Sequence, residues 1–230
     1  MGTWDAGLLD NDCAHDGVGT ISDGVVSDIL ALGAEKPTSA RVDTLGAAVG
    51  ILLQLSTYDF DPTAPNGPKV AAAVAAWKEP IATLSPPARD VLEAVGRGEG
   101  RRLAERRSSY PNDVTKVVGT RFGAREEALF ASKAAHDYVA TVADRCIAAA
   151  DEDFDSDAVT DLCREAYGMG ALAVLFVIAP YARQKKKVDH WRSRAREALE
   201  TLESQKDSEL EFHREYYANV DRALGVLADL

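Results

Sequence analysis

Residue types that bind divalent cations occur close together near the N-terminus of this 230-residue chain. Asp12, His15 and Asp16 offer two carboxylates and an imidazole, and both groups are common metal ligands. Asp12 and Asp16 are four residues apart, so a helix that begins here would place them on one face. Aspartate also accepts hydrogen bonds from the first N–H groups of a helix, which gives the segment a structural interpretation. The sequence favours this structural interpretation of the aspartates. The alternative is that they bind a metal ion, which would make the protein a metal-dependent hydrolase.

Two His-Asp pairs, His15-Asp16 and His136-Asp137, are similar to those of helical metal-dependent phosphohydrolases of the HD type. Those enzymes need a further upstream histidine and a downstream aspartate to complete the metal site. Neighbouring helical residues point about 100° apart, and we expect Asp137 opposite the apolar stripe of its helix, in solvent. The chain also lacks a nucleophile elbow, a phosphate-binding glycine loop and zinc-type Cys/His spacing. We therefore assign no catalytic residue and expect no cofactor.

The distribution of charge points to a protein partner. The formal net charge is -11, and the first 35 residues hold seven acids and no lysine or arginine. Such a chain is repelled by nucleic acid and by anionic membranes, so neither is expected as a partner, whereas a basic protein is attracted. Six aspartates are the candidate contacts for that partner: Asp5, Asp10, Asp12, Asp16, Asp23 and Asp28. The competing explanation is internal, because residues 97–125 hold eight basic residues against three acids and could face the acidic segment within the fold.

Composition and periodicity predict an all-α fold. Hydrophobic residues make up 46% of the chain and aromatic residues only 7%, and abundant alanine favours closely packed helices. We expect a bundle of about seven to nine helices that ends in an antiparallel helical hairpin over residues 188–227. The expected earlier helices span about residues 12–32, 39–58, 69–78, 86–96, 122–150 and 158–182, and a further short one follows residue 100.

The best candidate for a domain boundary is Tyr110-Pro111-Asn112. It divides the chain into an N-terminal helical region, 1–110, and a C-terminal helical bundle, 111–230. The sequence leaves open whether these are two domains or parts of one continuous domain. The chain is long enough to bury a core without disulfides or metals. Homo-oligomerisation is compatible with this composition.

Cysteine usage and hydropathy bear on location. The three cysteines, Cys13, Cys146 and Cys163, form no short-range pairing pattern, and we expect all three to be buried thiols in a reducing compartment. Residues 1–20 lack the basic start and the apolar stretch of a signal peptide, so none is expected. The segment Ala166–Ala182 is uncharged and is expected as a buried central helix, with a single membrane span as the alternative. We therefore expect a cytoplasmic protein.

The first residues form the most distinctive motif of the chain. Trp4 is expected to fill a core pocket, Gly7 to allow a positive φ or a close backbone approach, and Asn11 to help begin a helix. The segment resembles the opening of an uncharacterised bacterial family, domain-of-unknown-function family 4259, over about the first 100 residues. The matching positions are Gly2, Trp4, Gly7, Asp10, Asn11, Asp12, Ala14 and Asp16, whereas Asp5 replaces a glycine and Leu9 a phenylalanine of the family pattern.

The resemblance implies no activity, because that family has none established. Some small acidic bacterial proteins act as immunity or accessory proteins beside toxins. The comparison with them is an analogy based on size and charge. Together with the acidic N-terminus, it predicts a non-enzymatic protein-binding module, immunity-like or regulatory, that docks a basic partner protein.

Overall fold

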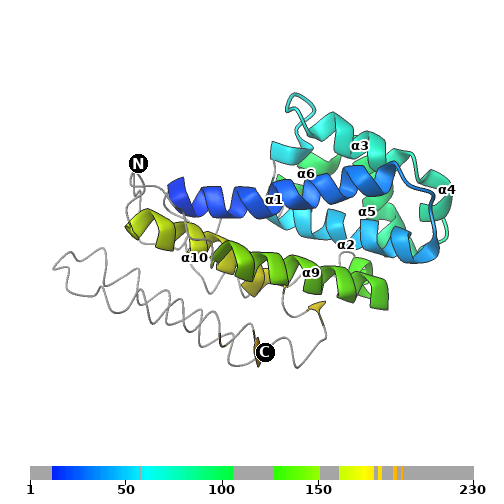
Figure 1. Ribbon diagram of the computed structural model, residues 1–230. Coiled ribbons are helices and arrows are strands. Elements are labelled where there is room, and N and C mark those ends of the chain that lie inside the picture. The colour runs from blue at the N-terminus through cyan, green and yellow to red at the C-terminus, as the bar shows by residue number, and fades with distance from the viewer. Residues whose placement is uncertain are drawn as a thin grey trace. The chain divides into compact units, whose positions relative to one another are not determined.

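The computed structural model describes residues 12–56, 58–105, 127–150 and 161–178, with a few single positions up to Ser193. These residues form eight α-helices and two 3₁₀ helices and contain no strand, which confirms the all-α multi-helix class (Figure 1). The elements are α1 (Asp12–Gly33), α2 (Ser39–Leu55), η1 (Tyr58–Phe60), α3 (Gly67–Ala75), α4 (Lys78–Ile81), α5 (Pro86–Gly96), α6 (Gly100–Glu105), η2 (Ala128–Phe130), α9 (Lys133–Ala150) and α10 (Asp161–Ile178). The predicted C-terminal hairpin lies outside the described residues, apart from Asp189, His190 and Ser193, which are exposed.

The chain divides into two compact units, each assembled from separate stretches of sequence. Of the described helical stretches, unit 1 holds residues 12–21, 140–150 and 161–178, and unit 2 holds 22–56, 58–105 and 127–139. Both α1 and α9 contribute residues to each unit. The boundary expected near residue 110 stays a prediction.

Helix α2 forms the centre of unit 2. It begins at Ser39, as expected from the sequence, and the Thr38 hydroxyl accepts a hydrogen bond from the N–H of Arg41. Every residue from Leu45 to Leu53 is buried, as is typical of a helix that is apolar all round. Helix α2 contacts α4, α5, α6 and η2, and α3 packs on α5 (Figure 1).

Helix α5 ends in a Schellman motif. Gly98 has a φ of 82°, a conformation that glycine adopts without a side-chain penalty. The N–H of Gly98 donates to the carbonyl of Val95 at 2.8 Å, and the N–H of Glu99 donates to that of Ala94 at 2.9 Å. Helix α6 then starts at Gly100, so the predicted interruption and resumption of the helix are confirmed.

The long helix predicted over residues 122–150 is wrong in its first part. Leu129 and Phe130 belong to the separate 3₁₀ helix η2, and α9 begins only at Lys133. The Ser132 hydroxyl accepts a hydrogen bond from the N–H of Ala135 at 3.1 Å, which starts the new helix. The phenyl ring of Phe130 packs beside Gly50 of α2, where a Cβ atom would approach it to 2.8 Å. The break therefore lets η2 pack directly on the backbone of α2.

Unit 1 rests on a close approach between α1 and α10. A Cβ at Gly17 would lie 2.1 Å from the carbonyl oxygen of Tyr167, and one at Gly170 would lie 2.0 Å from that of Ala14. Backbone contact of this kind requires glycine at both positions. The Tyr167 hydroxyl also donates a hydrogen bond of 3.0 Å to Oγ1 of Thr20. These contacts fix the first three turns of α1 against α10.

The cysteines differ from the sequence expectation. Cys13 is buried but disulfide-bonded, so the expectation of three thiols is wrong. Cys146 is a free, buried cysteine, and burial raises the pKa of its thiol. A disulfide is uncommon in a reducing compartment, so the cysteines no longer support the predicted cytoplasmic location.

Helix α10 covers most of the uncharged segment Ala166–Ala182. The residues from Ala171 to Leu175 are buried, in agreement with a central helix. Within the described part of the chain, no helix combines the length and the apolar character needed to cross a membrane.

Candidate functional site

Only part of the predicted acidic surface falls within the structure. Trp4, Asp5, Gly7, Asp10 and Asn11 lie outside the described residues. Asp12 is the first residue of α1, as expected of a helix start, but its side chain is also outside the description. The roles assigned to these six residues stay predictions, and the site is therefore built from α1 itself.

The exposed residues of α1 form one stripe. They are Asp16, Thr20, Asp23, Ser27 and Ala31, which follow each other at intervals of three and four. That spacing returns to the same face of a helix. The opposite face carries the buried side chains Ala14, Val18, Ile21, Val25 and Ile29. Helix α1 contains no lysine or arginine, so we call the exposed face, with Asp16 and Asp23, the acidic stripe.

Asp28 stands at the edge of this stripe and has a partner inside unit 2. Its side chain is half-buried, and its Oδ2 accepts a hydrogen bond of 2.9 Å from the hydroxyl of Tyr138 on α9. A carboxylate held in this way has less freedom to meet another protein than the exposed ones. Among the candidate partner-binding aspartates whose side chains the structure describes, Asp16 and Asp23 are exposed to solvent.

The proposed metal ligands do not assemble in the described residues. His15 is half-buried and Asp16 is exposed. Across residues 12–193, wherever the chain is described, no three His, Cys, Asp or Glu side chains come together as a metal ion would need. The contribution of Asp12 stays untested.

The second His-Asp pair is divided between two environments. Asp137 is exposed, as predicted, and accepts a short charged hydrogen bond from Lys133, one turn earlier. The Nε2 atom of His136 is buried and has no hydrogen-bond partner in the described structure. The two side chains therefore lie in different environments and do not form a shared metal-binding or catalytic site.

A buried polar cluster was missed by the sequence reasoning. Asp59 of η1 is only 4% exposed, and so is Ser22 of α1. The Ser22 hydroxyl donates to Oδ2 of Asp59 at 2.8 Å, and Nδ2 of Asn66 donates to Oδ1 at 3.0 Å. The N–H of Asp59 donates to the hydroxyl of Ser56 at 3.0 Å. The cluster ties α1 to the loop before α3, and no local pattern signals it because Ser22 and Asp59 are 37 residues apart.

The basic residues after α5 have acidic partners of their own. Arg97 pairs with Glu93 and Glu99, and Arg101 pairs with Asp61. The hydrogen bond between Arg97 and Glu99 raises the pKa of the guanidinium and lowers that of the carboxyl. These partners all belong to unit 2 and lie outside α1. For Arg97 and Arg101, the structure thus offers an explanation other than pairing with the acidic segment.

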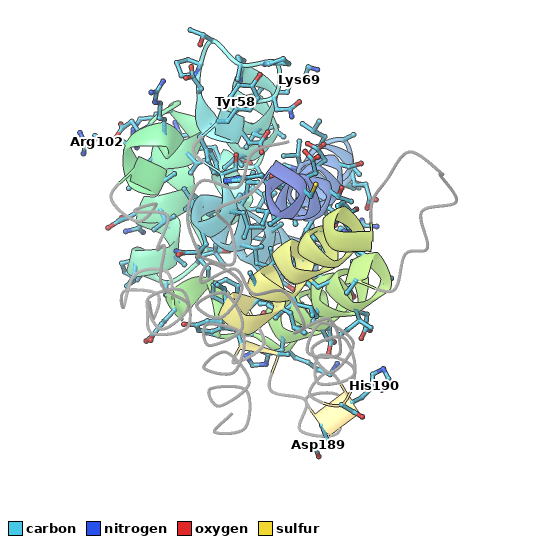
Figure 2. The ribbon with its side chains drawn as sticks, turned by 90° about the vertical axis from the view of Figure 1, so that its left-hand side faces the viewer. Tyr58, Lys69, Arg102, Asp189 and His190 are labelled. Atoms are coloured by element: carbon cyan, nitrogen blue, oxygen red, sulfur yellow. The ribbon has the colours of Figure 1, made fainter. Side chains whose placement is uncertain are left out.

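Other polar and aromatic side chains point outward from unit 2. Figure 2 shows Arg102 and Lys69 directed away from the ribbon. Tyr58 has 62% of its surface exposed. These three side chains come from α6, α3 and η1 and are single exposed residues, so they define no site.

Comparison with known proteins gives no match: no protein-family model, no curated protein and no solved structure is similar to this chain. The likeness of the N-terminal motif to domain-of-unknown-function family 4259 therefore stays an expectation. Function has to be argued from the acidic stripe and its surroundings.

Proposed function

We propose that this protein is a non-enzymatic binding module, immunity-like or regulatory in kind, that docks a basic partner protein through the acidic stripe of α1. The observation that carries the proposal is the presentation of Asp16 and Asp23 on one exposed face of a helix that has no positive side chain. Asp5, Asp10 and Asp12 would extend this charge toward the N-terminus. Membership in domain-of-unknown-function family 4259 is part of the same proposal. So is a cytoplasmic location, although the disulfide of Cys13 is uncommon in a reducing compartment.

The spacing of the two aspartates defines the partner that fits. Seven helical residues rise about 10 Å, so the carboxylates stand two turns apart. At physiological salt the Debye length is about 8 Å, which is shorter than the spacing of the two carboxylates. Each carboxylate therefore attracts a positive side chain of the partner independently of the other. A partner that presents lysine or arginine side chains about 10 Å apart, as on one face of a helix, would complement the stripe.

The energetics of exposed charge limit what the stripe contributes. Pairs of exposed charges contribute about 0–1 kcal/mol each, so two of them do not make a tight complex alone. Their stronger effect is on the rate of encounter and on the orientation of the partner. In the complex, the acids would therefore select a basic partner and orient it on α1.

The alternative function, a metal-dependent hydrolase using Asp12, His15 and Asp16, gains no observation from the described residues. No phosphate loop or nucleophile arrangement adds to it either. We therefore do not propose it as a second function.

The experiment compares three forms of the full chain as bait for host proteins at low salt. They are the wild type, the double variant Asp16→Asn/Asp23→Asn, and a control, Glu79→Gln/Asp90→Asn, that removes two exposed acids outside α1. We expect a basic protein to be retained by the wild type and the control and lost from the Asp16/Asp23 variant. Retention of the same proteins by all three forms would refute the proposal.

A further inference from the structure

We draw no further inference here: the strongest candidate, the disulfide of Cys13 in the first turn of α1, rests on a second sulfur atom outside the described side chains, so nothing in the structure shows what the bond would control.

Discussion

The hydroxyl of Tyr138 donates a hydrogen bond of 2.9 Å to Oδ2 of Asp28 and so joins α9 to α1 within unit 2. This bond separates the acids of α1 into two kinds. Asp28 is half-buried and serves the fold, whereas Asp16 and Asp23 are exposed and free of any demonstrated role in packing. The functional proposal rests on the second kind, and stability experiments can test the division.

We expect Tyr138→Phe to lower the free energy of unfolding by about 1 kcal/mol, because it removes a partly buried hydrogen bond to a charged group. Asp16→Asn and Asp23→Asn should each change it by less than about 0.5 kcal/mol, as is usual for exposed positions. Urea denaturation of the four proteins measures these differences. Equal effects of all three substitutions would show that Asp28 is not held as described.

The close approach of α1 to α10 makes a prediction for two glycines, Gly17 and Gly170. A methyl group at Gly17 or Gly170 would meet a backbone carbonyl oxygen, at 2.1 Å and 2.0 Å respectively. We expect Gly17→Ala and Gly170→Ala each to cost about 1–3 kcal/mol, the usual penalty of overpacking.

Gly19 is the matched control on the same helix. A Cβ at Gly19 would meet nothing within 4 Å, so Gly19→Ala should stabilise the protein by about 0.5–1 kcal/mol through helix propensity. Thermal or urea unfolding compares the three variants. Stabilisation by Gly17→Ala, as at Gly19, would contradict the packing of α1 on α10.

Two serines of α1 test the buried cluster around Asp59. Ser22 is buried and donates to Asp59, whereas Ser27 belongs to the exposed stripe. We expect Ser22→Ala to cost about 1–2 kcal/mol, because a buried carboxylate oxygen loses its donor. Ser27→Ala should leave the free energy of unfolding within about 0.5 kcal/mol of the wild type. If both serines prove equally replaceable, the cluster does not stabilise unit 2.

The carboxyl of Asp61 gives a prediction for pH. A hydrogen bond from the Thr63 hydroxyl, then one from the Thr63 N–H, lowers the pKa of this carboxyl below its ordinary value of 3.8, and Arg101 adds to the effect. A carboxyl whose pKa is lowered by folding stabilises the protein above the pKa of the unfolded chain. That stabilisation is lost as the pH falls through the folded pKa.

Thr63→Ala should therefore raise the Asp61 pKa, whereas Thr63→Ser keeps the hydroxyl and should leave it low. Carboxyl-carbon NMR titration from pH 6 downward, to about pH 2, reads this group directly. Arg101→Gln should raise the Asp61 pKa less than Thr63→Ala does, because the charge of Arg101 lowers this pKa less than the hydrogen bonds from Thr63 do. An unchanged pKa in Thr63→Ala would mean that the hydroxyl does not hold the carboxylate.

The disulfide of Cys13 predicts the number of reactive thiols. A disulfide within the chain uses two of its three cysteines, so denatured, unreduced protein should expose one reactive thiol and reduced protein three. Native protein should react slowly, because Cys146 is buried and its thiol pKa is raised. Three reactive thiols before reduction would show that the bond does not form.

Local signals in the sequence predicted local structure well. The start of α1 near Asp12, the start of α2 at Ser39 and the end of α5 near Gly96 were all expected, because each depends on residues within a few positions. The break before α9 was not expected, since alanine and leucine around it suit a helix. It is decided by the packing of Phe130 on Gly50, which are distant in the sequence.

The candidate site divides in the same way. Asp16 and Asp23 were named from the charge distribution of the N-terminal segment, whereas the bond from Tyr138 to Asp28 joins residues 110 positions apart. The cluster of Ser22 and Asp59 and the disulfide of Cys13 were missed for the same reason. Each depends on which helices meet, and a single sequence offers no local signal for that.

The central claim is that Asp16 and Asp23 steer a basic partner to α1, and its most direct test is the association rate at varied salt. With the captured partner, we predict that Asp16→Asn/Asp23→Asn slows association about 3–10-fold at low salt and that the rates converge as salt is raised. The control Glu79→Gln/Asp90→Asn should follow the wild type. Equal rates for the wild type and the Asp16/Asp23 variant at every salt concentration would contradict the account.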